Sequence, residues 1–193
     1  MKKTFVVGIA GGSASGKSTF SDALEKNLKD SKNLDVYVFH MDSYFKSVND
    51  RPQPYIEAPF SGVMYADDNH PTSIDLPKFA ADLEKAIAKA EYDVIIAEGL
   101  FTLWDKNIYS KLNLKLFIEC KPDERIVRRL KRNMAWGLSF DDIANVYLDM
   151  VRFRHEEYVE PSKWRADIIL NGSYSSEITL NMIVDYIKHN NFK

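Results

Sequence analysis

The chain has 193 residues, of which 45% are hydrophobic and 28% charged, a balance typical of a globular domain with a sizeable core. Its formal net charge of −2 does not indicate a polyanion-binding surface, so we expect no nucleic-acid partner. A single cysteine, Cys120, excludes an intrachain disulfide, and no segment resembles a signal peptide or approaches the ~20 apolar residues of a membrane span. We therefore expect one cytoplasmic domain over residues 1–193, without membrane contact.

Short apolar runs alternate along the chain with segments of helical periodicity. We predict strands at residues 4–10, 35–39, 93–97, 114–119 and 167–170. We predict helices at about residues 17–30, 76–90, 122–135, 140–159 and 175–190. Asp75 and Ser139 are predicted helix caps, and Pro161 ends the fifth helix. This alternation predicts an α/β fold, in which a parallel sheet carries helices on both faces.

A glycine-rich loop follows the first predicted strand. Its sequence, Gly-Gly-Ser-Ala-Ser-Gly-Lys-Ser-Thr, fits the pattern G-x-x-x-x-G-K-[ST], and the strand and helix that flank it supply the expected context. In such a loop the backbone N–H groups surround a phosphate chain, Lys17 reaches the β- and γ-phosphates, and Ser18 binds Mg²⁺. The following helix adds partial positive charge at its N-terminus. The predicted nucleotide-binding residues are Gly11, Gly12, Ser13, Ala14, Ser15, Gly16, Lys17, Ser18 and Thr19.

Two carboxylates come just after predicted strands. Asp42 follows the strand at 35–39, and Glu98 follows the strand at 93–97. Because ligands bind beyond the carboxyl ends of parallel strands, we expect both side chains near the metal and the γ-phosphate. Asp42 is the predicted base, and Ser18, Glu98 and Asp42 are the predicted metal neighbours. The alternatives are a turn or cap role for Asp42 and a solvated loop position for Glu98.

The segment from Ser43 to Ser73 shows no clear periodicity. It contains four prolines and several aromatic residues, including Tyr44, Phe45, Tyr55, Phe60 and Tyr65. A loop this long in a compact domain is usually functional or mobile. Within it, Asp67-Asp68-Asn69-His70-Pro71 could bind acceptor hydroxyls or form a turn ahead of the next helix, and the residues alone leave both interpretations open.

Four arginines share one face of the predicted helix at 122–135: Arg125, Arg128, Arg129 and Arg132. The opposite face carries an apolar stripe of Ile126, Leu130 and Met134. Like charges three and four residues apart destabilise a helix, and a bound polyphosphate would offset that repulsion. We therefore expect at least one of these arginines to contact phosphate, and the alternative is an ordinary solvated face.

Several further motifs occur in an order that matches one family. They are residues 41–45 (Met-Asp-Ser-Tyr-Phe), 70–71 (His-Pro), 96–99 (Ile-Ala-Glu-Gly), 114–118, 128–132, and 156–169. With the glycine-rich loop, these motifs resemble the uridine/cytidine kinases, within the uridine kinase–phosphoribulokinase group of P-loop kinases. The resemblance covers nearly the whole chain, and the combination is much more specific than the loop alone.

The resemblance implies a P-loop NTPase-type sheet of about five parallel strands, with flanking helices and a short lid that bears arginines. It implies transfer of the γ-phosphoryl of ATP to a primary hydroxyl, such as the 5′-OH of a nucleoside. The family's base maps onto Asp42, its Mg²⁺-associated carboxylate onto Glu98, and its arginines onto Arg129 and Arg132. A homo-oligomer would be in keeping with the resemblance, because members often form tetramers.

Three departures from the family concern the acceptor. Uridine kinases carry a base-reading β-hairpin before the strand that ends in Glu-Gly, whereas here only residues 90–92 separate helix from strand. Asn69 stands where the family has an aspartate that binds ribose hydroxyls, and residues 136–138 (Trp-Gly-Leu) replace an Arg-Gly-Arg pair. A site that has lost hydrogen-bonding groups should show a loosened or redirected choice of substrate.

Together these features predict an ATP- and Mg²⁺-dependent kinase for a small acceptor, most specifically uridine, cytidine or a related riboside. The predicted catalytic residues are Lys17, Asp42, Arg129 and Arg132. The predicted acceptor-binding residues are Asp42, Tyr44, Phe45, Asn69, His70 and Arg129. Alternative acceptors are nicotinamide riboside, pantothenate-like molecules and sugars, and alternative functions are a P-loop ATPase or nucleotide switch.

Overall fold

Five parallel strands form the central sheet of the protein, seen here in a computed structural model that describes residues 4–32, 34–59 and 61–191. The strands are β1 (Phe5–Gly11), β2 (Val36–His40), β5 (Val94–Glu98), β6 (Leu114–Glu119) and β7 (Ile168–Asn171). Their spatial order is β2-β5-β1-β6-β7, and all neighbours pair in parallel. The predicted sheet is confirmed, and each strand lies within one residue of its predicted position.

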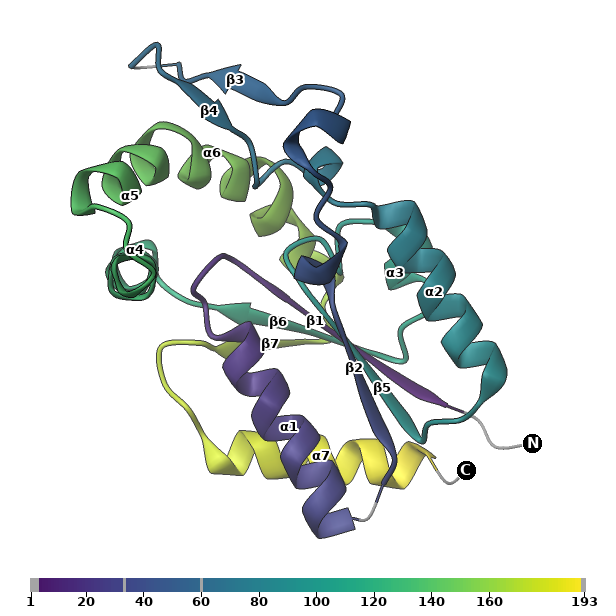
Figure 1. Ribbon diagram of the computed structural model, residues 1–193. Coiled ribbons are helices and arrows are strands. Elements are labelled where there is room, and N and C mark those ends of the chain that lie inside the picture. Colours follow the sequence, from purple (N-terminus) through teal and green to yellow (C-terminus); the bar gives the residue numbers. More distant parts are fainter. Residues whose placement is uncertain (1–3, 33, 60, 192–193) are drawn as a thin grey trace.

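Helices cover both faces of this sheet, as Figure 1 shows. Helices α1 (Lys17–Lys32) and α7 (Glu177–Asn191) lie on one face, and α2 (Leu76–Lys89) and the short α3 (Lys106–Tyr109) on the other. Side chains of a strand alternate between its faces, so Val7 joins the core beneath α1 and α7 while Val6 joins the core beneath α2. Every residue of β1 is buried, as expected for a central strand covered on both sides.

A second group of helices lies beyond the carboxyl ends of the strands. Helix α4 (Pro122–Ala135) is followed by one continuous helical run composed of α5 (Phe140–Val146), a π-helical turn (Tyr147–Val151), α6 (Arg152–Arg154) and a second π-helical turn (His155–Val159). The run begins at the predicted cap, where Ser139 Oγ accepts a hydrogen bond from the Asp142 N–H at 3.1 Å. The run ends at Val159, just before Pro161, as predicted, and a 3₁₀ segment (Glu160–Arg165) follows it.

The segment 43–73 is more ordered than its sequence indicates. It contains a β-hairpin of β3 (Tyr55–Glu57) and β4 (Met64–Ala66), together with short 3₁₀ turns. Ile56 and Tyr65 of the hairpin pack against Tyr147 and Met150 of the long helical run. The expectation of an irregular loop was therefore wrong here, because strands of three residues are too short to show an alternating pattern. Phe60 lies outside the described residues.

The hairpin lies elsewhere in the chain than the base-reading hairpin of uridine kinases. Residues 90–93 connect α2 directly to β5 without a strand, as the sequence indicates. The connection begins at Ala90, whose backbone adopts the left-handed conformation (φ 52°) that commonly ends a helix.

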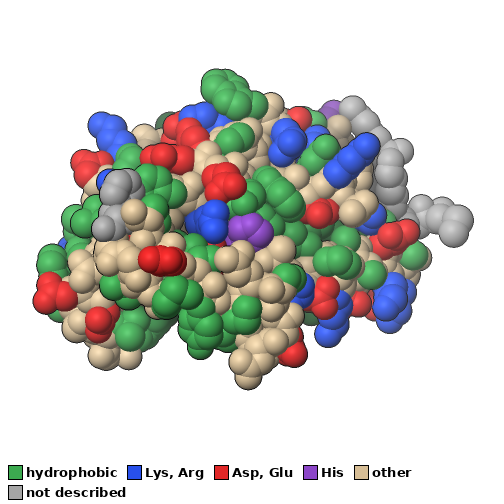
Figure 2. Space-filling view, turned by 90° about the horizontal axis from the view of Figure 1, so that it is seen from above, with side chains coloured by type: hydrophobic (Ala, Val, Ile, Leu, Met, Phe, Trp, Pro, Cys, Tyr) green, Lys and Arg blue, Asp and Glu red, His purple; other side chains and the backbone are tan. Residues whose placement is uncertain are grey.

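On the face seen in Figure 2, acidic and basic side chains are interspersed with hydrophobic ones and form no large region of one sign. This view agrees with the small net charge of the chain. Within the described part of the chain, no helix combines the length and the apolar character needed to cross a bilayer.

Candidate active site

The glycine-rich loop connects β1 to α1 at the carboxyl edge of the sheet. Three of its residues have positive φ angles: Gly11 has φ 149°, Ala14 has φ 61° and Gly16 has φ 102°. A side chain at Gly11 would bring a Cβ atom to 2.5 Å from the Ile118 carbonyl oxygen, so only glycine fits there. Three members of the loop are buried: Gly11, Gly12 and Ser15. The others line an open cavity: Ser13, Ala14, Gly16, Lys17, Ser18 and Thr19.

Lys17 and Ser18 begin α1 and face two acidic side chains. Lys17 Nζ donates to the Gly12 carbonyl oxygen at 3.1 Å, and Ser18 Oγ lies 3.4 Å from both carboxylate oxygens of Glu98. Burial lowers the pKa of Lys17, while the carboxylates of Glu98 and Asp42 act in the opposite direction. The lysine and the two carboxylates thus surround the place where the motif positions the terminal phosphates and their metal.

Glu98 is almost fully buried, with 4% of its surface exposed. Besides Ser18, it contacts His40, whose Nδ1 lies 3.0 Å from Glu98 Oε1. A buried carboxylate needs such polar partners, so the geometry excludes the alternative of a solvated loop position for Glu98. Two carboxylate oxygens and a hydroxyl are the type of ligand that Mg²⁺ prefers.

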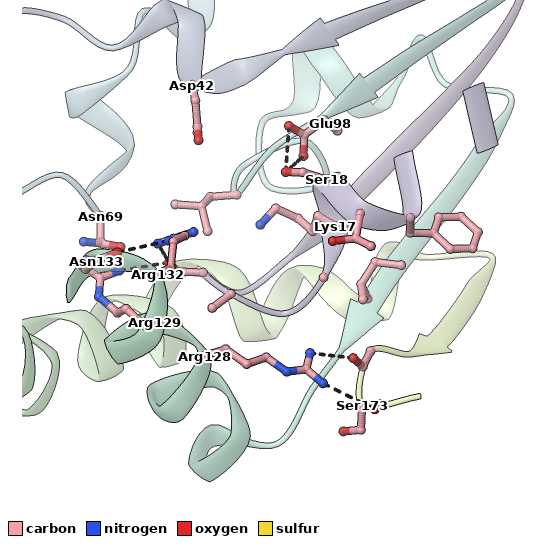
Figure 3. Close-up of a pocket in the computed structure, with 18 of the residues that line it drawn as sticks. Lys17, Ser18, Asp42, Asn69, Glu98, Arg128, Arg129, Arg132, Asn133 and Ser173 are labelled. Atoms are coloured by element: carbon pink, nitrogen blue, oxygen red, sulfur yellow. Dashed lines mark hydrogen bonds between the residues drawn. The ribbon is translucent and has the colours of Figure 1, made fainter. Parts of the chain in front are cut away.

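Asp42 lies in the 3₁₀ turn (Met41–Tyr44) that follows β2. Figure 3 shows its carboxylate pointing into the cavity from the wall opposite α4. Burial lowers the pKa values of Lys17 and Arg132, and the charge of Asp42 opposes this effect at both groups, so the three lie within electrostatic reach of one another. A carboxylate here can accept a proton from a hydroxyl held between the two walls.

Two arginines of α4 converge on Ser13 of the glycine-rich loop. Arg129 Nη1 donates to Ser13 Oγ at 2.9 Å, and Arg132 Nη2 lies 3.4 Å from the same hydroxyl oxygen. Burial lowers the pKa of Arg129, and the neighbouring Arg132 lowers it further. Two cations held side by side at the loop form a site for an anion.

The apolar stripe of α4 is exposed in part, since Met134 has 49% of its surface in solvent. Ile126 and Leu130 of the stripe are half-buried, and Ile126 packs against the cluster that contains Tyr147 and Met150. Arg128 turns to the loop after β7, where it donates to the Gly172 and Ser173 carbonyl oxygens at 2.7 and 3.4 Å. Arg128 therefore holds backbone, whereas Arg129 and Arg132 face the cavity.

The cavity extends from the glycine-rich loop to the hairpin segment and has a volume of about 1490 Å³. Pockets for one small ligand commonly measure ~300–1000 Å³, so this cavity has room for two. One end is formed by the loop, α4 and residues 172–176, and the other end includes Phe45, Tyr65 and Asn69. A donor nucleotide and an acceptor could therefore meet between Lys17 and Asp42.

Four of the six predicted acceptor-binding residues line the cavity, and two do not. Asp42, Phe45, Asn69 and Arg129 are lining residues. The Tyr44 hydroxyl instead points to Asp82, 3.3 Å away, and its ring packs against Phe79. His70 caps the next turn, since its Nδ1 accepts from the Thr72 N–H at 3.2 Å. The structure thus places Tyr44 and His70 in supporting contacts outside the cavity.

Comparison with known proteins identifies the family. The family model described as Phosphoribulokinase / Uridine kinase family matches residues 65–178, more than half of the chain. The chain belongs to this family. A uridine kinase of Staphylococcus aureus (strain JH9) is 30% identical over 211 aligned residues, which cover 97% of each chain. The protein is accordingly a kinase, and membership of a kinase family implies ATP as the phosphoryl donor.

Solved structures of this kinase type share the fold. A protein of Silicibacter sp. TM1040, assigned as a fructose transport system kinase, superposes with a TM-score of 0.69 at 18% identity, covering 88% of this chain and 91% of that one. The structure of a possible uridine kinase from Bacillus stearothermophilus superposes with a TM-score of 0.55 at 20% identity, covering 89% and 90%. These likenesses agree with the parallel sheet and the helices that cover it.

Three features of this kinase site are absent from the sequence prediction. Asp67 is buried and pairs with Arg154 of the long helical run, with Arg154 Nε 2.7 Å from Asp67 Oδ2. Asp68 lines the cavity and pairs with Arg51 at 2.7 Å. Asn133 is buried at the cavity wall, where its Oδ1 accepts from Arg132 Nε at 3.1 Å. The adjacent aspartates stood out in the sequence, but their partners lie too far along the chain to be inferred.

Proposed function

We propose that this kinase transfers the γ-phosphoryl of ATP to a hydroxyl of a small riboside, with the 5′-OH of uridine or cytidine as the leading candidate. The observation that carries the proposal is a single two-ended cavity with Lys17, Arg129 and Arg132 at one wall and Asp42 at the other. The identity to a uridine kinase across nearly the whole length of both chains supports the choice of acceptor.

On the donor side, the backbone of the glycine-rich loop and Lys17 bind the β- and γ-phosphates. Ser18, Glu98 and Asp42 supply the oxygen groups that would hold Mg²⁺, which neutralises phosphate charge when it is bound. Arg129 and Arg132 stabilise the negative charge on the phosphoryl group as it moves, because both guanidinium groups meet at Ser13 of the loop.

On the acceptor side, Asp42 orients the hydroxyl and accepts its proton as the new bond to phosphorus forms. Phe45 and Tyr65 provide apolar walls that help to exclude water, and the Asn69 amide can bind a hydroxyl as donor or acceptor. Water must be kept out because it competes with the acceptor for the phosphoryl group.

A second candidate acceptor is a small alcohol other than a pyrimidine nucleoside, such as nicotinamide riboside, a pantothenate-like molecule or a sugar. The observation that favours it is the direct connection from α2 to β5 through residues 90–93, which leaves no base-reading hairpin there. Asn69 in place of an acidic residue also weakens the selection of ribose hydroxyls.

The experiment is a panel of acceptors with ATP and Mg²⁺, in which ADP formation and the phosphorylated product are measured together. We expect uridine or cytidine to raise ADP formation and to yield one 5′-phosphorylated product. A different acceptor with that result would support the second candidate. Equal ATP consumption with and without every acceptor would overturn both proposals in favour of an ATPase.

A further inference from the structure

Two buried side chains meet behind the glycine-rich loop, on the side away from the cavity. Arg125 of α4 has only 3% of its surface exposed, and the His155 side chain only 11%. Arg125 Nε donates to the Cys120 carbonyl oxygen at 3.1 Å, but its Nη1 has no hydrogen-bond partner among the described residues. The buried Nδ1 of His155 has none within the same part of the chain. Buried polar atoms without partners are uncommon and need an explanation.

Both atoms adjoin Gly12 of the loop. A Cβ atom on Gly12 would lie 2.5 Å from Arg125 Nη1 and 3.0 Å from His155 Nδ1, so the two side chains press against the same side of this residue. Any larger residue at position 12 would displace them. Gly12 in turn accepts the Lys17 ammonium at its carbonyl oxygen, and thus connects these side chains to the phosphate-binding lysine.

The contacts of His155 determine which of its ring nitrogens carries the proton. His155 Nε2 lies 3.3 Å from a carboxylate oxygen of Glu160, which can only accept, so Nε2 carries the proton and Nδ1 presents a lone pair. Burial lowers the pKa of His155 to about 4. The Arg125 guanidinium also lowers this pKa, whereas the Glu160 carboxylate acts in the opposite direction. A neutral acceptor and the N–H of a guanidinium therefore face Gly12 together.

Arg125 is also a buried cation. Within the described residues, no carboxylate lies within the 4.0 Å of an ion pair from its guanidinium group. A buried charge needs compensation, and the phosphate chain of a bound nucleotide lies just across the loop. The charge of Arg125 would then favour the nucleotide-bound state without touching the nucleotide.

We propose that Arg125 and His155 are positioning residues of the nucleotide site, which act through Gly12 to hold the first turn of the glycine-rich loop. Arg125 adds positive charge behind the loop, and His155 places a neutral ring against the same side of Gly12. The inference rests on the proposed binding of ATP by this loop. It assigns a role to the first arginine of α4, which faces away from the cavity that Arg129 and Arg132 line.

The test measures the Kd of ATP by calorimetry without acceptor, and KM for the acceptor separately. His155→Asn retains an amide near the position of Nδ1, whereas His155→Gln retains one near Nε2. We expect His155→Gln and Arg125→Met to weaken ATP binding by about tenfold or more, because a displaced loop loses its aligned contacts, while His155→Asn stays within about twofold. The acceptor KM should change little in all three variants.

Two controls separate this inference from the proposed function. Glu156→Gln changes the exposed neighbour of His155 and should bind ATP as the wild type does. Lys17→Ala should lose ATP affinity through the loop itself. If Lys17→Ala weakens binding but Arg125→Met and His155→Gln do not, or if the Asn and Gln variants of His155 behave alike, the positioning role is wrong. If the wild-type protein does not bind ATP, the proposed function fails and this inference fails with it.

Discussion

The hydroxyl of Ser18 lies 3.4 Å from both carboxylate oxygens of Glu98, although 80 residues separate the two in the chain. The sheet brings them together, because Glu98 ends β5 and pairs in register with Ile9 of β1, just before the loop that leads to Ser18. Burial of Glu98 then leaves its carboxylate with few partners other than Ser18 and His40. The fold thus builds an oxygen-rich site beside Lys17 from two adjacent parallel strands.

Replacement of Glu98 by glutamine should raise the concentration of Mg²⁺ needed for half-maximal activity. The amide keeps the size of the side chain but removes the charge, and loss of such a group costs roughly 10–100-fold in metal affinity or activity. The measurement is activity against Mg²⁺ concentration at saturating ATP. Glu91→Gln, on the exposed connection before β5, is the matched control and should leave the Mg²⁺ dependence unchanged. An unaltered Mg²⁺ curve for Glu98→Gln would contradict the metal role.

Replacement of Arg129 by glutamine should lower kcat by about 10²-fold or more, because a charged donor that stabilises the transferring phosphoryl group is lost. Steady-state kinetics with a defined acceptor would give kcat and both KM values. Lys131→Gln alters an exposed cation on the same helix and should keep near-wild-type kcat. An equal loss of kcat in the two variants would contradict a direct role, because it would mean that Arg129 contributes only to the net charge of the helix.

The buried pair of Asp67 and Arg154 should contribute strongly to stability. Asp67 is only 3% exposed, whereas Arg154 is 21% exposed and also pairs with Glu157 at 2.7 Å, so Asp67→Asn should cost about 2 kcal/mol in the free energy of unfolding. Urea unfolding measures this value. The surface pair of Glu84 and Lys111 provides the comparison, since Glu84 is 71% exposed and Glu84→Gln should cost less than ~1 kcal/mol. Similar losses in both variants would contradict the assignment.

Acid should destabilise the protein partly through His155. Its pKa in the folded protein is about 4, against 6.5 for a free imidazole, so between these values the unfolded chain binds more protons. This contribution to stability is complete above about pH 6.5 and is lost as the pH falls toward 4. The groups that act on the ring are Arg125 and Lys17, which oppose its charge, and Glu160, which favours it.

The check is the free energy of unfolding at about pH 7 and about pH 5, compared between the wild type and His155→Gln. The variant cannot take up this proton, so its loss of stability on acidification should be smaller, by up to about 2 kcal/mol. An equal pH dependence in the two proteins would show that His155 is not the buried neutral group described here.

The donor half of the site was predictable because its residues lie in local motifs. The glycine-rich loop and Asp42 come after strands and Glu98 is the last residue of one, and the rule that parallel strands end at one edge places all three together. The sheet was predicted within one residue per strand because buried parallel strands appear as short apolar runs. Local patterns carried these predictions without any knowledge of distant contacts.

The acceptor half was not predictable for the opposite reason. Asp67 and Arg154 are 87 residues apart, and the hairpin strands are too short to show a period. Tyr44 and His70 belong to matching motifs, yet their side chains turn to Asp82 and Thr72, because a motif fixes position along the chain and not the direction of a side chain. On α4, the sequence placed four arginines on one face but did not show that Arg128 would turn to the loop after β7.

The kcat of Asp42→Asn, measured with an acceptor found in the panel, is the most direct test of phosphoryl transfer by this site. The amide cannot accept the hydroxyl proton, so kcat should fall by about 10²-fold or more, while the Kd of ATP measured without Mg²⁺ stays near the wild-type value. Asp50→Asn, on the exposed 3₁₀ turn that follows, is the control and should keep normal kcat. If Asp42→Asn turns over the same acceptor at the wild-type rate, Asp42 is not the base and the proposed arrangement of donor and acceptor is wrong.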